Sequence, residues 1–255
     1  MNQTVNDNLI LISGTSSSGK SASLRNLLDP EGVLYANCES GKKLPFPNKF
    51  AKFTITDPYQ VIEIFNHLAA SDYTIDHPQL NKKVKIHTVV VDSLTFLLDM
   101  FESLYIFNAA DGQKAWGAFQ QFFKSLMQDK VASAQCNVVF TAHTITDINK
   151  SEMVMETKVP VKGALKNNGI EAYFSCVVST KKLPLKDLEK YTNDMLEITE
   201  DDELVNFKHV FQTRLTKDTT HERIRSPMGM FTTNETFIDN DVQKLLNHLH
   251  SYYEN

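Results

Sequence analysis

The chain has 255 residues, 42% of them hydrophobic, and a formal net charge of −5. This size suits one large folded domain, and the acidic balance argues against a protein that coats nucleic acid through bulk electrostatics. No apolar run reaches membrane-helix length, and the start, MNQTVNDN, lacks the features of a secretion signal. We therefore expect a cytoplasmic protein without membrane contact. Cys38, Cys136 and Cys176 are widely spaced, which predicts reduced thiols rather than disulfides or a zinc site.

In the first 144 residues, aliphatic runs alternate with stretches of helical periodicity, as in a parallel sheet covered by helices. The pattern predicts strands over 8–13, 32–38, 52–56, 86–93 and 136–144, and a helix over 59–70. Two helical segments are expected between the last two strands, the second over 111–134 with Asp111 as its cap. Its apolar stripe should pack on the sheet, and consists of Trp116, Phe119, Phe123 and Met127.

The second half of the chain is less regular. Residues 145–169 predict a long loop or hairpin, and 170–183 a further strand. Residues 186–204 form an acidic insertion that we expect to be exposed and outside the sheet. Residues 206–217 alternate like a late antiparallel strand, and 239–255 predict a capped helix. No internal repeat divides the chain, so we expect a single α/β domain over 1–255, with a mostly parallel central sheet, flanking helices and a late antiparallel extension.

A glycine-framed polar loop follows the first predicted strand and precedes helix-forming residues. It satisfies the pattern G-x-x-x-x-G-K-[ST], whose backbone N–H groups cradle the phosphates of a nucleoside triphosphate. Bulky side chains would hold the backbone away from those oxygens. The predicted nucleotide-binding residues are Gly14, Thr15, Ser16, Ser17, Ser18, Gly19, Lys20, Ser21 and Ala22. The alternative is a serine-rich turn that only caps a helix.

The same loop implies a magnesium site. Lys20 is expected between the β- and γ-phosphates, and the Ser21 hydroxyl in the shell of Mg²⁺. Asp92 ends the aliphatic run TVVVD and is the predicted acidic ligand of the metal. On its own, an aspartate at this place is often just the end of a strand.

Hydrolysis also requires a group that activates water, and Ser93 stands where many motor ATPases have a glutamate. Here the chain resembles the RecA-like ATPases, in which a glutamate after the second strand is the base and a serine follows the metal aspartate. The resemblance implies that Glu39 is the base. It also implies that His143, after VVFTA, senses the γ-phosphate in place of the glutamine of RecA. The alternative for Glu39 is a solvated loop carboxylate, and the alternative for His143 is an ordinary polar residue at the end of a strand.

The order of motifs from Leu9 to Phe231 looks like that of phage-encoded AAA/RecA-like ATPases, some of which are single-strand annealing recombination proteins. The resemblance implies a RecA-like fold, the cofactors ATP and Mg²⁺, and a location in the host cytoplasm. It also implies a homo-oligomer, ring or filament, in which Arg214 and Lys217 act as catalytic cations on the neighbouring subunit. Alternatively, these are only exposed basic residues balanced by Asp218 and Glu222.

Residues 145–169 occupy the place of the DNA-binding loops of RecA-like recombinases. Lys158, Lys162 and Lys166 recur every fourth residue and are the candidate DNA contacts. The segment also carries the acidic residues Asp147, Glu152 and Glu156, and no aromatic residue for base stacking. A solvated connector is therefore the competing interpretation.

The sequence thus predicts a Mg²⁺-dependent ATPase that acts on single-stranded DNA in phage recombination, annealing or replication. A phage single-strand-binding or replication protein is an expected partner. Three alternatives stay open. The ATPase acts instead on a protein partner in packaging, helicase loading or counter-defence; the chain is a nucleotide or small-molecule kinase; or it is a binding module that uses nucleotide as a switch.

Overall fold

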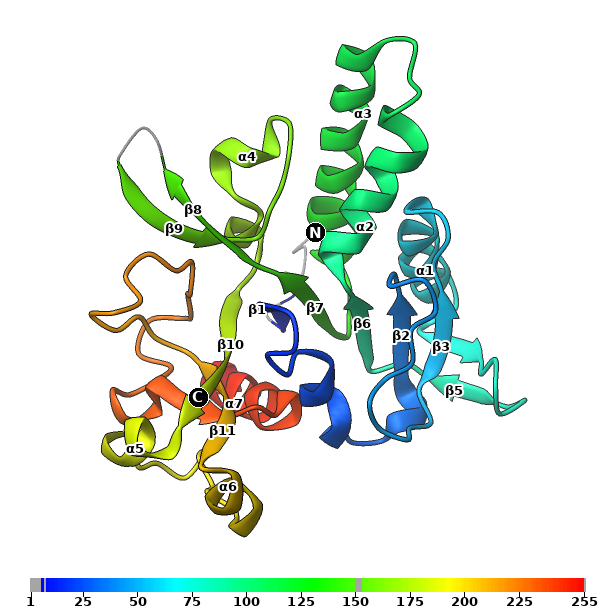
Figure 1. The fold of residues 1–255 in the computed structure, drawn as a ribbon. Helices are drawn as coiled ribbons and strands as arrows, with labels where there is room; N and C mark the ends of the chain where they lie inside the picture. Colours follow the sequence, from blue (N-terminus) through cyan, green and yellow to red (C-terminus); the bar gives the residue numbers. More distant parts are fainter. Residues whose placement is uncertain (1–5, 7, 150–152, 255) are drawn as a thin grey trace.

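The computed structural model describes residues 6, 8–149 and 153–254, the side chains of 167 and 168 excepted. Its centre is an eight-stranded sheet in the order β12-β11-β10-β1-β7-β6-β2-β3 (Figure 1). From β10 to β3 the strands are parallel, and β11 and β12 extend the sheet antiparallel. The strand bounds are β1 Leu9–Gly14, β2 Val33–Asn37, β3 Ala51–Thr54, β6 Thr88–Asp92, β7 Asn137–His143, β10 Cys176–Pro184, β11 Phe207–Gln212 and β12 Phe237–Asp239. The predicted fold class is confirmed.

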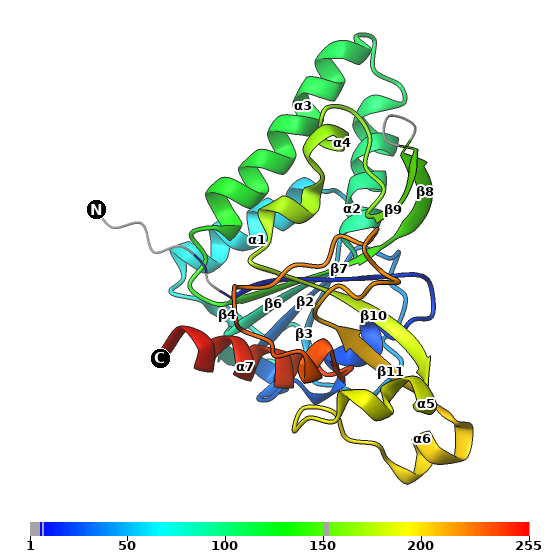
Figure 2. The ribbon, with the colours of Figure 1, turned by 90° about the vertical axis from the view of Figure 1, so that its left-hand side faces the viewer.

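Alternate residues of the central strands face two separate cores. Leu9 and Leu11 of β1 belong to one core, and Ile10 and Ile12 to the other. Helices α1 (Tyr59–Ala70), α2 (Leu94–Phe101) and α3 (Gly112–Lys124) cover one face of the sheet, and α7 (Val242–Glu254) covers the opposite face (Figure 2). Because both faces are buried, the strands are apolar throughout rather than alternating.

The helices confirm the predicted apolar faces and caps. The Asp111 carboxylate accepts a hydrogen bond from the backbone N–H of Lys114 at the start of α3. Phe119, Phe123 and Met127 are buried against the sheet, while Trp116 is partly buried at the same core. Helices α2 and α3 continue as the π-helical stretches η3 (Glu102–Ile106) and η4 (Ser125–Val131). The three cysteines are buried free thiols, as expected.

Several short elements were not predicted. They are the strand β12, the 3₁₀ turns η2 (Pro30–Gly32) and η7 (Asn234–Thr236), and a small hairpin of β4 (Thr74–Asp76) and β5 (Lys83–Lys85). Of the described residues, no helix combines the length and apolar content that a membrane crossing needs.

The segment 145–169 contains an antiparallel hairpin that projects beyond the sheet (Figure 1). Its strands are β8 (Ile145–Asn149) and β9 (Val154–Lys158), and the short helix α4 (Leu165–Asn168) follows. Residues 150–152, which include Glu152, lie outside the described residues. The 3₁₀ turn η5 (Ile170–Tyr173) then leads into β10, so the strand predicted from 170 begins later, at Cys176.

The acidic insertion lies outside the sheet and is folded against its antiparallel end. It comprises α5 (Leu185–Leu188), η6 (Glu189–Tyr191) and α6 (Glu200–Val205). Leu188 packs in a small third core with Val210 of β11 and Phe237 of β12. The insertion is therefore attached to the two late strands by apolar contacts.

Candidate nucleotide-binding site

The predicted nucleotide and metal residues, with Glu39 and His143, meet at one edge of the sheet because they follow parallel strands. The glycine-framed loop follows β1, Glu39 follows β2, Asp92 ends β6 and His143 ends β7. Register pairs Gly14 with His143 and Asn37 with Asp92. Ligands of open α/β sheets bind at this edge. A cavity of about 550 Å³ opens there, and Lys20, Ser21, Glu39, Asp92 and His143 all line it.

The loop holds its lysine inward. The Lys20 side chain is buried, and its ammonium donates to the carbonyl oxygens of Gly14, at 3.0 Å, and Thr15, at 2.6 Å. The helix that follows, η1, is a 3₁₀ helix of only six residues, Ser21–Asn26. With so short a helix, the loop backbone and Lys20 rather than a helix dipole must provide the positive field for phosphate.

Asp92 is the centre of a hydrogen-bond network. Its carboxylate accepts hydrogen bonds from Ser21 at 2.9 Å, from the hydroxyl of Tyr35 at 2.7 Å and from the Thr141 hydroxyl. Burial raises the pKa of Tyr35, so its hydroxyl remains a donor. The neighbouring β2 and β7 thus fix the orientation of the carboxylate, as outer partners commonly do for metal ligands.

The donor set fits Mg²⁺. A serine hydroxyl and one carboxylate are hard oxygen ligands, and Mg²⁺ takes its remaining ligands from water and phosphate oxygens. Within the described ranges, no group of three or more His, Cys, Asp or Glu side chains could hold a metal ion. Ser21 and Asp92 are therefore the candidate ligands for a cation that binds together with the nucleotide.

Glu39 and His143 are connected to Lys20 by a chain of contacts. The Nδ1 atom of His143 lies 3.5 Å from the Lys20 ammonium, and its Nε2 atom lies 3.5 Å from a Glu39 oxygen. An ammonium only donates and a carboxylate only accepts, so a neutral ring with its proton on Nε2 satisfies both contacts. Lys42 approaches the second Glu39 oxygen at 3.1 Å.

The pKa values of Lys20 and Glu39, at the two ends of this series of contacts, are lowered by different causes. Burial lowers the pKa of Lys20 to about 8, although the carboxylates of Asp92 and Glu39 act in the opposite direction. The hydrogen bond from His143, with another from Lys42, lowers the pKa of Glu39 to about 2 against the effect of burial. At neutral pH the site therefore presents an ammonium and a fully ionised carboxylate to the same cavity.

The far wall of the cavity comes from residues that the sequence did not single out. Asn240, in the turn between β12 and α7, donates through Nδ2 to the Gly19 carbonyl at 3.1 Å. His209 of β11 lies 2.9 Å from the Ser18 carbonyl through Nδ1. Gly19 has a φ of +107°, and a Cβ there would lie 2.3 Å from the Asn240 amide nitrogen, so this glycine is required by contact as well as by backbone conformation.

The other predicted residues lie away from this cavity. Arg214 and Lys217 follow β11 rather than lying in it, and they line a separate cavity of about 610 Å³. The Arg214 guanidinium donates to the Phe231 carbonyl at 2.6 Å. Within one protomer, these two cations therefore do not line the cavity of the glycine-framed loop.

The candidate DNA lysines line a third cavity, between the β8–β9 hairpin and helix α2. Lys162 donates two hydrogen bonds to Glu102, at 2.7 and 2.8 Å, and Lys158 pairs with Glu156. Lys166 is exposed and forms no ion pair with the part of the chain that the structure describes.

Comparisons of the sequence and the structure with known proteins identify a family for this chain. No curated protein sequence matches the chain. The crystal structure of the RadB recombinase is similar, at 16% sequence identity and a TM-score of 0.36, over 71% of this chain and 77% of that one. So distant a likeness carries no argument about fold or activity. A profile of the AAA domain family matches residues 6–203, which contain the glycine-framed loop, Glu39, Asp92 and His143. The chain belongs to the AAA domain family.

Proposed function

We propose that this protein is a Mg²⁺-dependent, RecA-like ATPase that acts on single-stranded DNA in phage recombination, annealing or replication. The observation that supports hydrolysis best is the chain of contacts from Lys20 through His143 to Glu39, beside the pair Ser21 and Asp92. These residues combine a phosphate cradle, hard metal ligands and an ionised carboxylate in one cavity.

Each residue has a role in this proposal. The loop backbone and the Lys20 ammonium bind the phosphates and neutralise charge that develops on them. Ser21 and Asp92 would hold Mg²⁺, which would supply charge neutralisation beside the phosphates. Glu39 orients the attacking water and accepts its proton, and His143 connects this carboxylate to the lysine.

Steady-state phosphate release tests the enzyme. Hydrolysis of ATP should require Mg²⁺, and Lys20→Ala should abolish both nucleotide binding and turnover, because the loop then loses its only side-chain cation. Lys83→Ala, an exposed lysine of β5 outside the cavity, is the matched control and should behave like the parent. Lys20→Ala with full nucleotide affinity would refute the phosphate-loop assignment.

The DNA part of the proposal has a separate test. Single-stranded DNA should stimulate phosphate release, and Lys166→Ala should weaken that stimulation more than Lys162→Ala, because Glu102 already neutralises Lys162. Absence of stimulation at every DNA concentration would remove DNA from the proposal and leave the ATPase intact.

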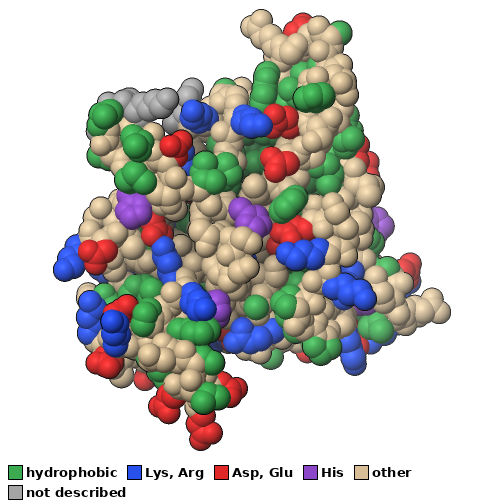
Figure 3. Space-filling model, viewed as in Figure 1, with side chains coloured by type: hydrophobic (Ala, Val, Ile, Leu, Met, Phe, Trp, Pro, Cys, Tyr) green, Lys and Arg blue, Asp and Glu red, His purple; other side chains and the backbone are tan. Residues whose placement is uncertain are grey.

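One observation favours a protein as the effector instead. The hairpin presents exposed apolar side chains, which gather over β8 and β9 (Figure 3), including Ile145, Ile148, Val154 and Met155. Of the three candidate lysines in and after the hairpin, Lys158 and Lys162 are paired with glutamates. Exposed apolar surface of this kind is more typical of protein contact than of phosphate contact. Stimulation by a phage replication protein in the absence of DNA would select this second function.

A further inference from the structure

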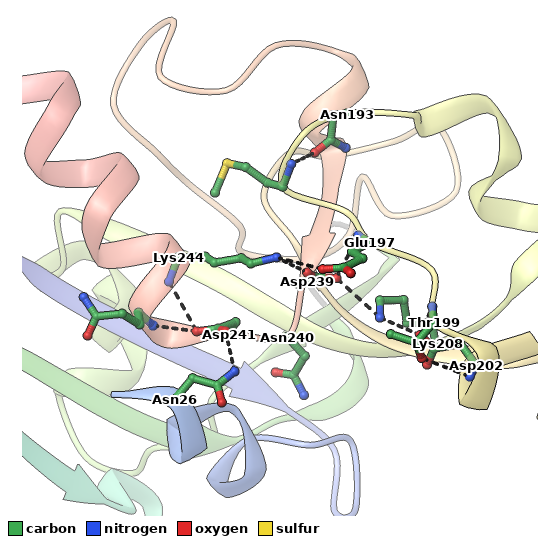
Figure 4. Close-up of polar contacts among 12 residues, drawn as sticks. Asn26, Asn193, Glu197, Thr199, Asp202, Lys208, Asp239, Asn240, Asp241 and Lys244 are labelled. Carbon is green, nitrogen blue, oxygen red and sulfur yellow. Dashed lines mark hydrogen bonds and ion pairs between the residues drawn. The ribbon is translucent and has the colours of Figure 1, made fainter. Parts of the chain in front are cut away.

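The acidic insertion lies beside the phosphate loop and is held there by ion pairs. Lys208 of β11 contacts Asp202 at 2.8 Å and Asp239 at 3.4 Å. Lys244 of α7 pairs with Asp239 and reaches Glu197 of the insertion at 4.0 Å. Figure 4 shows these side chains as one network next to Asn240 and Asn26. The network fixes the insertion against the turn that contacts Gly19.

Asp202 is fixed by one oxygen and open at the other. Its Oδ2 atom accepts hydrogen bonds from the Thr199 N–H at 3.0 Å, from the Thr199 hydroxyl at 2.8 Å and from Lys208 at 2.8 Å. Its Oδ1 atom accepts none from the described residues. Asp202 also lines the cavity that contains Lys20. Asp202 therefore brings to the wall of the nucleotide cavity a carboxylate that is held in place and can still accept hydrogen bonds.

Two neighbours add further acceptors. The contact of His209 Nδ1 with the Ser18 carbonyl requires a proton on Nδ1, which leaves Nε2 as an acceptor when the ring is neutral. Asn240 is 3% exposed, and its Oδ1 atom has no hydrogen-bond partner in the described part of the chain. Both residues line the same cavity. A buried amide oxygen without a partner is a group that a ligand can satisfy.

The acidic charge beside this wall disfavours phosphate there. The first turn of α6 contains only acidic residues, Glu200, Asp201, Asp202 and Glu203, and Lys208, the cation of the wall, is already shared between two carboxylates. The triphosphate must therefore lie at the other end of the cavity, at Lys20 and Ser21. What remains for the acidic end is the uncharged part of a nucleotide, which carries hydroxyl and amino donors.

We propose that Asp202, His209 and Asn240 form the nucleoside subsite, in which Asp202 accepts hydrogen bonds from the ribose hydroxyls and makes the protein selective for ribonucleotides. This inference rests on the proposed binding of a nucleoside triphosphate at the glycine-framed loop. It gives the acidic insertion a role in recognising the nucleotide.

Calorimetry on the full chain with Mg²⁺ tests the subsite with three probes, ATP, 2′-deoxyATP and inorganic tripolyphosphate. The parent protein should bind ATP about tenfold more tightly than 2′-deoxyATP, because a hydrogen bond to a charged group is lost. Asp202→Asn should remove this preference and leave affinity for tripolyphosphate unchanged. Glu203→Gln, an exposed neighbour in the same helix that does not line the cavity, is the control and should keep the preference.

The outcomes separate the inference from the proposed function. Equal affinity of the parent for ATP and 2′-deoxyATP would overturn the inference without any variant, even if Asp202→Asn failed to fold. Equal losses for tripolyphosphate and ATP in Asp202→Asn would also overturn it, because Asp202 would then act on the loop rather than on the ribose. If the parent bound none of the three probes, the phosphate loop itself would be refuted.

Discussion

Lys20 loses its charge as the pH rises from neutral to alkaline, because its surroundings lower its pKa. Burial holds its pKa at about 8, compared with an ordinary value of 10.5, and the two nearby carboxylates only partly offset that effect. Phosphate binds the protonated ammonium and raises its pKa in the complex. Affinity for Mg²⁺-ATP should therefore be constant below pH 8 and fall by about tenfold per pH unit above it.

Calorimetry between pH 7 and pH 9.5 measures this dependence. Lys20→Arg is the matched control, because a guanidinium keeps its charge over the whole range and its affinity, although weaker, should be independent of pH. A parent protein whose affinity does not change up to pH 9.5 would contradict the assigned environment of Lys20.

Glu39 is the second residue that allows a sharp prediction. Its low pKa, about 2, keeps it ionised at every pH at which the protein is assayed, so a loss of activity cannot be attributed to protonation. Glu39→Gln should lower the turnover number by about 10²- to 10³-fold, because the amide cannot accept a proton from water. Nucleotide affinity should remain within a few fold, since Lys20, Ser21 and Asp92 are unchanged.

Phosphate release and calorimetry on the same preparation separate these two effects. Glu31→Gln is the control, since Glu31 pairs with Lys49 and Lys82 and does not line the nucleotide cavity. Full turnover by Glu39→Gln would show that another group activates water, and the role of Glu39 would have to be abandoned.

At the scale of the elements, two glycines show how context decides the effect of one substitution. Gly117 is exposed within α3, and a Cβ there would meet no atom within 4 Å. Gly117→Ala should therefore raise the free energy of unfolding by up to about 1 kcal/mol through helix propensity. Gly19→Ala should instead distort the loop, because its Cβ would collide with Asn240.

Urea unfolding and ATP binding report on the two variants. Gly117→Ala should shift the urea midpoint upward without a change in nucleotide affinity, whereas Gly19→Ala should lose affinity. A destabilised Gly117→Ala would mean that α3 is not a regular helix at this position. Normal affinity in Gly19→Ala would mean that the loop and the Asn240 turn are not in close contact.

The elements near the site are predictable from sequence where local pattern determines them. The runs that form β1, β6 and β7 are apolar on both faces, and the residues that follow each run are close together in space because parallel strands end at one edge. For this reason the pattern of strands alone predicts that Lys20, Asp92 and His143 lie together.

The far wall of the site is not predictable in this way. Asn240 lies 221 positions after Gly19, and nothing local distinguishes it from the other polar residues near α7. Its contact exists because the three-residue strand β12 returns the chain to the loop, and so short a strand leaves no periodic signal. The excess of acidic residues over 186–204 predicted an exposed segment, and much of it is exposed. The number of charges alone could not show that Lys208 and Lys244 form ion pairs that hold this segment in place.

At the scale of the whole molecule, the proposed catalytic cations Arg214 and Lys217 do not line the nucleotide cavity of their own protomer. The cavity that contains Lys20 is also lined by Arg25, but this arginine donates to the carbonyls of Ala22 and Asn240. Arg214 and Lys217 lie around a different cavity. If Arg214 stabilises the charge of the transferred phosphoryl group, it must do so on the neighbouring subunit, and hydrolysis must depend on assembly.

Mixing two inactive variants tests assembly directly. Arg214→Ala keeps an intact base but lacks the cation, and its turnover should fall by about 10³-fold. Glu39→Gln lacks the base but still offers Arg214 to a neighbour. If Arg214 acts between subunits, a mixture of the two should regain a substantial part of the parent activity, because each Glu39→Gln subunit completes the site of an adjacent Arg214→Ala subunit. Light scattering on the same samples should show oligomers.

Arg225→Ala, whose guanidinium contacts the Ala172 carbonyl instead, is the control and should be active alone. Full activity of Arg214→Ala alone, or no recovery in a mixture that has assembled, would exclude Arg214 as the catalytic cation acting between subunits.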